Sequence, residues 1–307
     1  MTRPPFPTVL DSTLMSHARS CHRQVFLSSF EHWKPRTRSV HLHAGAAYAR
    51  GLEVAREAFY SGSCGEREAI EKGLHALVVA YGDFECPPDS AKSLERMMGA
   101  FEFYFSSYPM GTDAAKPASL PGGKLGIEFS FAEPIGIAHP ETGEPLLYCG
   151  RFDMICDYAG QRFGEDDKTT SQLGASWSKQ WDLRSQFTAY TWGARKAGIT
   201  LDGFIIRGVS ILKTKYDTQQ AITYRPAWVV DRWYTQLLRD VNRLIAAWRE
   251  GYWDYDLDEA CNSYGGCQFR KICLAEPERA INWLRQDFER RRWDPITRTE
   301  TPLPDEA

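Results

Sequence analysis

The hydrophobic periodicity of this chain changes between helical and strand spacing several times, and that order limits the folds open to it. Residues 48–59 and 70–81 repeat apolar side chains every three to four positions, which predicts two amphipathic helices. A third helix is expected after Ser90, which is a good N-cap residue. The first third of the chain is therefore predicted to be helical.

The middle of the chain has the alternation and the turn residues typical of strands. Residues 125–131 alternate apolar and polar side chains, which places Glu128 on the face opposite the apolar set. Residues 146–156 and 162–170 follow as predicted strands, joined by a turn at 158–161. Together these segments are expected to form an antiparallel meander.

More helices and strands are predicted beyond the meander. They are a helix over 176–196 ended by Gly198, a strand pair at 203–212 and 221–224, and a long amphipathic helix from 230 to 248. This order of elements is typical of an α/β protein with one mixed sheet flanked by helices.

We expect four parts that make one structural unit. Residues 1–110 are the helical N-terminal part and residues 111–250 the α/β core. Residues 251–292 hold a cysteine-rich segment and a basic helix, and residues 293–307 are expected to be a disordered tail because they are rich in proline and acidic side chains.

Charge and hydropathy exclude several classes of protein. The 37 Lys and Arg residues and the 40 Asp and Glu residues give a formal net charge of −3, so any contact with nucleic acid must be local. No apolar run approaches the roughly 18 residues that a membrane helix needs. The start of the chain has prolines in place of an apolar signal segment. We expect a cytoplasmic protein that does not contact a membrane.

Two carboxylates and a lysine are predicted to share one face of the sheet. Asp153 lies near the end of one strand, and Asp166 and Lys168 are two residues apart on the next. Side chains two apart on a strand point the same way, so the three groups can meet. Carboxylates hold Mg²⁺ or Mn²⁺, and a nearby ammonium can orient a water, as metal-assisted phosphodiester hydrolysis requires. An isolated Asp-x-Lys triplet more often marks a solvated strand end.

The following helix adds a third motif, because Gln186 and Tyr190 are spaced so that they share one helix face. The ordered set resembles the RecB-like branch of the PD-(D/E)XK nucleases, whose patterns are G-x-x-D, D-x-K-T and Q-x-x-x-Y. The resemblance covers roughly residues 12–275 and implies a restriction-endonuclease-like fold. The matching residues are Gly150, Asp153, Asp166, Lys168, Thr169, Gln186 and Tyr190.

The resemblance also implies roles for these residues. Asp153 and Asp166 would bind the metal ion, Lys168 would be the catalytic lysine, and Gln186 and Tyr190 would support the site or touch DNA. Many relatives add a histidine ligand in the first helix, where this chain has alanine at residue 49.

Several residues could replace that histidine as the additional metal ligand. We expect Glu128 to be the additional metal ligand, with Glu53 as an alternative. His41 and His43 lie upstream of the family's histidine position and are left out of the site.

Eight cysteines are spread unevenly, with three of them in the thirteen residues 261–273. In a reducing cytoplasm, clustered cysteines more often bind metal than form disulfides. Iron-sulfur nucleases of the same branch, including AddB-type helicase-nucleases and CRISPR-associated exonucleases, place one cluster ligand near the N-terminus and three near the C-terminus. This resemblance implies a 4Fe-4S cluster that joins the two terminal segments. Its ligands would be Cys21, Cys261, Cys267 and Cys273.

The spacing of these cysteines leaves the metal open. The C-terminal trio is C-x5-C-x5-C, whereas the family trio is C-x2-C-x5-C, which displaces Cys261 by three residues. A structural zinc ion would use the same four residues.

The function that the resemblance implies is a metal-dependent DNA nuclease, acting as an exonuclease on single strands or duplex ends in recombination, repair or phage DNA processing. The sequence has no helicase P-loop, so duplex unwinding would require a helicase or recombination partner. Arg184, Arg195 and Lys196 are candidate phosphate contacts on the motif helix. The alternative is a non-catalytic DNA-binding or scaffold protein that keeps the fold and the cluster.

Overall fold

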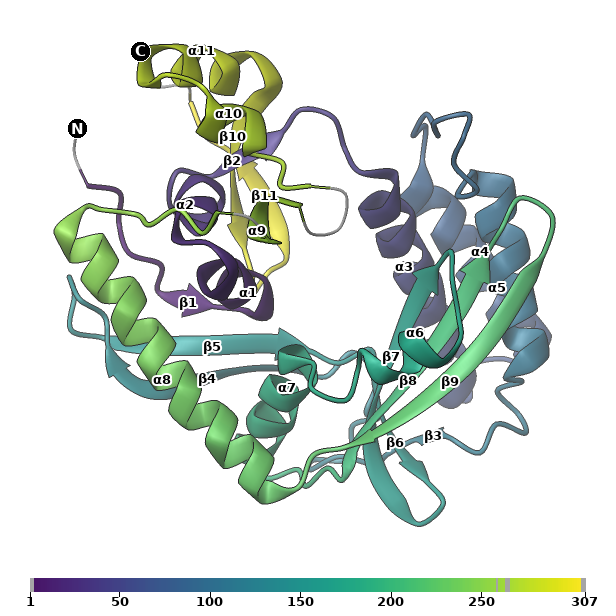
Figure 1. The fold of residues 1–307 in the computed structure, drawn as a ribbon. Coiled ribbons are helices and arrows are strands. Elements are labelled where there is room, and N and C mark those ends of the chain that lie inside the picture. Colours follow the sequence, from purple (N-terminus) through teal and green to yellow (C-terminus); the bar gives the residue numbers. More distant parts are fainter. Residues whose placement is uncertain (1–2, 258, 263–265, 305–307) are drawn as a thin grey trace. The chain divides into compact units, whose positions relative to one another are not determined.

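The structure, a computed structural model, describes residues 3–257, 259–262 and 266–304 (Figure 1). The chain divides into two compact units, each assembled from separate stretches of sequence. Unit 1 comprises residues 1–37, 131–150 and 231–307, and unit 2 comprises residues 38–130 and 151–230. The stretches 1–110 and 111–250, which we expected to be consecutive parts, therefore each contribute to both units.

Unit 2 is built on a five-stranded mixed sheet, which confirms the α/β class. Its order is β3-β6-β7-β8-β9. β7 and β8 are parallel, and the other neighbouring strands are antiparallel. The strands are β3 (Lys116–Pro117), β6 (Met154–Tyr158), β7 (Gln161–Thr170), β8 (Gly203–Ile211) and β9 (Tyr216–Tyr224).

Helices cover both faces of this sheet. Val209 and Ile211 of β8 share a core with α3, α4 and α5, whereas Phe204 of the same strand stacks on Phe187 of α7 with ring centroids 4.6 Å apart. Every residue of β8 is buried, as expected for a strand covered on both sides. The helices are α3 (Val40–Tyr60), α4 (Glu66–Tyr81), α5 (Leu94–Ser107), α6 (Ala175–Lys179) and α7 (Ser185–Lys196).

The helices predicted before residue 250 are confirmed, with two changes. The N-cap of α5 is Ser93 and not Ser90, because the Ser93 hydroxyl accepts a hydrogen bond from the Arg96 amide. The helix predicted over 176–196 is divided into α6 and α7. Gly198 follows α7 with a φ of 77°, as its predicted stop role requires. The long helix is confirmed as α8 (Ala227–Glu250), and no helix among the described residues has the length and hydropathy of a membrane span.

The strand predicted at 125–131 is wrong, and so is the position it gave Glu128. Residues 125–129 form a connecting segment in which Glu128 has a φ of 53°, and Ile127 makes only an isolated bridge to Met154, whereas residues 130 and 131 begin a strand. Phe129 packs near Phe152 at a ring distance of 5.9 Å, but burial does not follow the apolar alternation, because Leu125 is exposed and Gly126 is buried. The segment forms backbone hydrogen bonds with residues 118 and 152–155, but the turn at Glu128 keeps these contacts from becoming a continuous strand ladder.

The predicted meander is also different, because the strand expected over 146–156 is divided at residues 152–153. β5 (Pro145–Arg151) pairs with β1 (Val9–Leu10) and β4 (Ser130–Ala138), whereas β6 belongs to the five-stranded sheet. The division places Asp153 in the short connection between two sheets.

Unit 1 joins the N-terminal and C-terminal segments by strand pairing. β10 (Phe288–Asp294) pairs antiparallel with β2 (Trp33–Pro35) and with β11 (Thr299–Pro302). The basic helix expected up to residue 292 ends at residue 287, and the tail expected to be disordered from 293 forms part of this hairpin. Local composition cannot predict the pairing of β10 with β2, because the two strands are more than 250 residues apart in the sequence.

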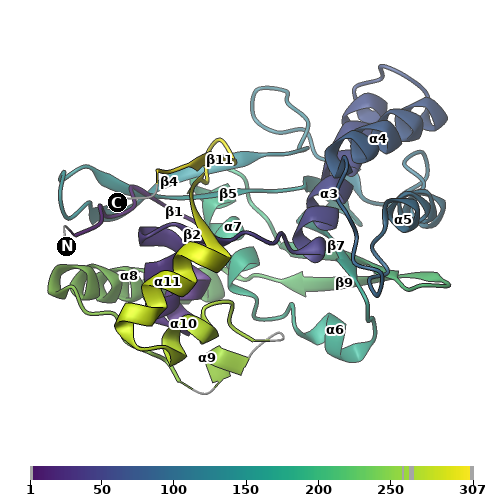
Figure 2. The same ribbon diagram turned by 90° about the horizontal axis from the view of Figure 1, so that it is seen from above.

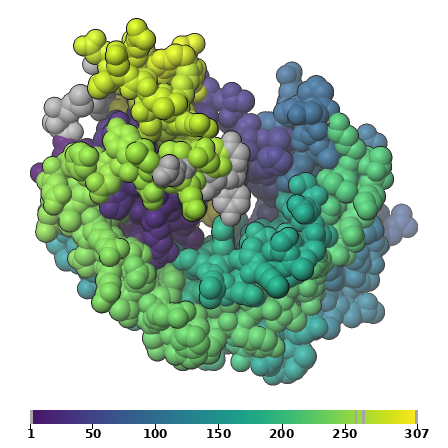
Figure 3. All heavy atoms as spheres, in the orientation of Figure 1, coloured from purple at the N-terminus to yellow at the C-terminus, as the bar shows by residue number. Residues whose placement is uncertain are grey.

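The helices of unit 1 pack around this pairing. Residues of the N-terminal segment, such as Leu27 and Trp33, share a core with Phe269, Ile272 and Leu284 from the C-terminal segment. The two segments lie side by side in Figure 1 and Figure 2, and Figure 3 shows their atoms next to each other at the surface of this unit. The helical elements besides α8 are α1 (Ser12–Ser20), α2 (His22–Val25), the π-helical turn η1 (Phe26–Phe30), α9 (Glu259–Asn262), α10 (Arg270–Leu274) and α11 (Pro277–Asp287).

Candidate active site

Asp153, Asp166 and Lys168 come together on one face of the unit 2 sheet. Lys168 Nζ forms an ion pair with a carboxylate oxygen of Asp166. Asp153 Oδ2 accepts a hydrogen bond from the backbone amide of Asp167 at 3.0 Å, which fixes it beside β7. The charges of the three groups act on one another's pKa, as expected for close neighbours.

Burial dominates the electrostatics of this cluster. Desolvation raises the pKa of Asp166 to about 7, with the Lys168 ammonium opposing the rise and the Asp153 carboxylate adding to it. The pKa of Asp153 is raised by the same burial. Two buried carboxylates thus share a single ammonium, so the site has an excess of negative charge. That donor set fits a hard divalent cation, and Mg²⁺ commonly binds through one or two carboxylates while keeping several waters.

The helix motif lies beside this cluster. Gln186 Nε2 donates to Tyr190 Oη at 3.5 Å across one turn of α7. The pKa of Tyr190 is raised by burial, and among the charges that act on it are those of Asp166 and Asp153. The ring of Phe152 lies 5.1 Å from that of Tyr190. The structure therefore brings all three motifs to one place.

Glu128 lies near the cluster, but its side chain is engaged elsewhere. Its amide donates to the Asp153 carbonyl at 3.2 Å, whereas its Oε2 forms an ion pair with Arg151 Nε at 2.6 Å. Among the residues that the structure describes, no three His, Cys, Asp or Glu side chains are arranged to hold a metal ion. The structure thus does not group Glu128 with Asp153 and Asp166.

The candidate phosphate contacts on α7 are exposed but separated. Arg184 immediately precedes the helix, and Arg195 and Lys196 lie in its last turn. Eleven residues of helix separate the ends by roughly 16 Å. These three side chains do not form a single basic patch.

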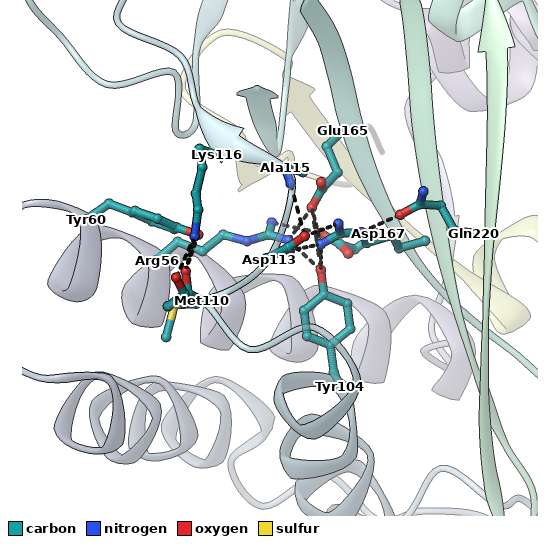
Figure 4. Close-up of polar contacts among 12 residues, drawn as sticks. Arg56, Tyr60, Tyr104, Met110, Asp113, Ala115, Lys116, Glu165, Asp167 and Gln220 are labelled. Carbon is teal, nitrogen blue, oxygen red and sulfur yellow. Dashed lines mark hydrogen bonds and ion pairs between the residues drawn. The ribbon is translucent and has the colours of Figure 1, made fainter. Parts of the chain in front are cut away.

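A buried ionic network, which the sequence analysis missed, lies on the opposite face of β7 (Figure 4). Arg56 of α3 bonds to Glu165 Oε1 at 2.6 Å and to Asp167 Oδ2 at 2.8 Å. Arg207 of β8 bonds to Asp113 at 2.5 and 2.8 Å and lies 3.6 Å from Glu165. Arg207 is a charged residue in the largely apolar strand β8. This was the feature of the sequence that could have revealed the network.

The four predicted cluster cysteines all belong to unit 1 and line one cavity of about 20 Å³. Burial raises the pKa of Cys273, and charges on the other three cysteines add to that rise, so the four thiols are neighbours. Cys21 Sγ also accepts a hydrogen bond from the Asp256 amide at 3.5 Å. All eight cysteines are free thiols.

Comparison with known proteins gives limited similarity. No family model matches the chain, and no curated protein matches it. A solved structure described as a "putative exonuclease" from Eubacterium rectale is 12% identical and covers 83% of this chain and 87% of its own, with a TM-score of 0.48. The protein SSO0001 is 13% identical over 64% of this chain and 74% of its own, with a TM-score of 0.28.

Proposed function

We propose that this protein is a metal-dependent nuclease that hydrolyses phosphodiester bonds in DNA. The observation that carries the proposal is the pair of buried carboxylates, Asp153 and Asp166, sharing the Lys168 ammonium beside Tyr190. Exonuclease action, on single strands or duplex ends in recombination, repair or phage DNA processing, follows from the motif resemblance. The assignment of this protein to the PD-(D/E)XK nucleases is part of the same proposal.

Each residue of the site has a distinct part in this reaction. Asp153 and Asp166 would hold Mg²⁺ or Mn²⁺, which when bound polarises the phosphate and lowers the pKa of a bound water. Lys168 donates hydrogen bonds to the attacking water or to a phosphate oxygen, where negative charge develops. Tyr190, which accepts a hydrogen bond from Gln186, would support the site beside Lys168 and the carboxylates.

The four cysteines of unit 1 are proposed to hold a 4Fe-4S cluster. A single zinc ion would bring four Sγ atoms to within about 4 Å of one another. The preference for the 4Fe-4S cluster rests on the resemblance, and zinc is the alternative for the same four residues. Iron, sulfide and zinc analysis of anaerobically purified protein decides between the two. We propose a cytoplasmic location, because a reducing compartment would keep clustered cysteines available to bind metal.

Digestion of end-labelled single-stranded and duplex DNA with Mg²⁺ or Mn²⁺ tests the proposal. Wild-type protein is compared with Asp166→Ala and with Asp157→Ala, whose carboxylate lies on β6 outside the site and pairs with Arg162 at 2.8 Å. We expect cleavage by wild type and Asp157→Ala and none by Asp166→Ala. Equal cleavage by all three would contradict the proposed site.

A non-catalytic DNA-binding or scaffold protein is the second candidate. The alanine at residue 49, where relatives have a histidine, and the absence of a third grouped ligand among the described residues favour it. Protein that retains its cluster and binds DNA but never cuts it would support this candidate. Addition of a helicase or recombination partner is then the remaining test for activity, because the proposed nuclease has no P-loop.

A further inference from the structure

We propose that Arg56 is a positioning residue that sets the metal affinity of Asp153 and Asp166 from the opposite face of the sheet. This inference rests on the proposed function. The ion pairs of Arg56 are with Glu165 and Asp167 and not with Asp153 or Asp166. The charge of Arg56 reaches Asp153 directly, but its orienting effect passes through Asp167, which lies between Asp166 and Lys168 in the sequence.

The guanidinium of Arg56 holds the strand on both sides of Asp166. Its two terminal nitrogens bond to Glu165 at 2.6 Å and to Asp167 at 2.8 Å. These carboxylates alternate with Asp166 along β7, so they point away from the metal pair. The side chains of Arg56, Glu165 and Asp167 are 4%, 0% and 3% exposed, so water does not compete for these contacts.

Asp167 connects the two faces. Its side chain is held by Arg56, and its backbone amide donates to Asp153 Oδ2 at 3.0 Å. The direction of that amide depends on the backbone of residue 167, which the ion pair restrains. Loss of the Arg56 contact would leave the buried Asp167 carboxylate unpaired, so the strand would shift to find it another partner. Asp153 would then lose its fixed orientation.

A buried ion-pair network is weak evidence for a role in stability. Replacing a buried ionic group by well-packed apolar residues is often neutral or stabilising. A planar guanidinium, however, can hold two carboxylates in fixed directions, which an apolar contact cannot do. Groups that orient metal ligands typically change metal affinity 10-fold to 100-fold when they are removed.

Arg207 provides a matched control in the same network. Its side chain is 2% exposed, it bonds to Asp113 at 2.8 Å, and like Arg56 it bonds to Tyr104 Oη, at 3.4 Å. It is the register partner of Asp167 on β8, yet its ion pairs are with Asp113 and Glu165. Arg207→Lys therefore disturbs the same buried network as Arg56→Lys but leaves intact the ion pair that restrains residue 167.

The test is Mn²⁺ titration of the full chain, followed by electron paramagnetic resonance without DNA, alongside thermal unfolding. We expect Arg56→Lys to weaken Mn²⁺ binding by about 10-fold or more, because one ammonium cannot hold both carboxylates in the same geometry. Arg207→Lys should lower the melting temperature similarly and keep the wild-type Mn²⁺ affinity. Wild-type affinity in Arg56→Lys, or an equal loss in both variants, would overturn the inference.

Asp167→Asn keeps the test decisive if Arg56→Lys does not fold. It retains the backbone amide and the side-chain size but removes the charge that Arg56 holds. We expect weaker Mn²⁺ binding in this variant too, and wild-type affinity would overturn the inference. Failure of the wild type itself to bind Mn²⁺ would instead overturn the proposed metal site, and the positioning role with it.

Discussion

At the scale of single residues, β7 is unusual because charged side chains occupy both of its faces. Asp166 and Lys168 face the candidate site, while Glu165 and Asp167 face Arg56 on the other side. Because a strand alternates its side chains, a change on one face is transmitted through the backbone to the other. The catalytic role of Lys168 and the effect of other buried charges on folding stability can each be tested by a separate substitution.

Lys168→Ala is expected to abolish most DNA cleavage while the fold is retained. The variant removes the ammonium that faces the reacting phosphate and leaves Asp166 without its ion-pair partner. Loss of one preorganised donor of this kind typically lowers kcat by about 10²-fold or more. Steady-state kinetics with Mn²⁺ measure the effect, with exposed Lys179 on α6, changed to alanine, as the control. A kcat close to wild type in Lys168→Ala would be incompatible with the proposed role.

Lys92→Met is expected to stabilise unit 2 at neutral pH. Lys92 is 6% exposed, its Nζ donates to the Thr169 hydroxyl at 2.8 Å, and burial lowers its pKa to about 8. The folded pKa lies below the unfolded one, so the unfolded state binds more protons between about pH 8 and 10.5 and stability rises with pH there. The cost at pH 7 is up to about 3 kcal/mol.

Urea unfolding at pH 7 and at pH 9.5 checks this prediction. The wild type should gain stability between the two values beyond any gain seen in Lys92→Met. Parallel changes in the two proteins would show that Lys92 does not carry an unfavourable charge in the folded state.

At the scale of elements, long periodic segments were predicted well and short connections were not. The helices α3, α4 and α8 and the strands β7 and β8 follow directly from spacing, because each has a buried face of many residues. The strand predicted around Glu128 failed because the backbone turns there, with a φ of 53° at Glu128, so that only isolated bridges form. Arg56 was missed because an arginine on a helix is normally a surface residue, and only its partners on β7 reveal its burial.

Gly73→Ala is expected to destabilise the contact between α3 and α4 by about 1 to 3 kcal/mol. A Cβ at Gly73 would lie 2.6 Å from the Gly51 carbonyl oxygen and 2.7 Å from Ala55 Cβ, so the two helices would have to move apart. Gly45→Ala is the matched control, since its Cβ would have only one neighbour, at 3.9 Å. That change should instead stabilise α3 by about 1 kcal/mol. Chemical denaturation of both variants measures the difference, and equal effects would contradict the close helix contact.

At the scale of the whole molecule, the chain crosses repeatedly between two units, which local patterns cannot show. The fold class depends on the kind and order of elements, so it was predicted. The division into units depends on pairings such as β2 with β10, whose partners are remote in sequence and carry no mutual signal. One consequence is that the site residues belong to unit 2 and the four cluster cysteines to unit 1.

Cys267→Ser tests whether the cluster and the candidate active site are separable. A bound cluster would stabilise the folded form of unit 1, because metal binding to an ordered site contributes folding free energy. We expect the variant to lose iron and to lose hydrogen-exchange protection in α1 and α10 by at least about 10-fold. α3 and β8 should keep their protection, and Mn²⁺ binding should be unchanged, because Asp153 and Asp166 lie in unit 2. Cys64→Ser, in unit 2, is the control and should retain iron. A Cys267→Ser protein with normal iron content and protection would remove the cysteine cluster from the proposal and leave the nuclease site to stand alone.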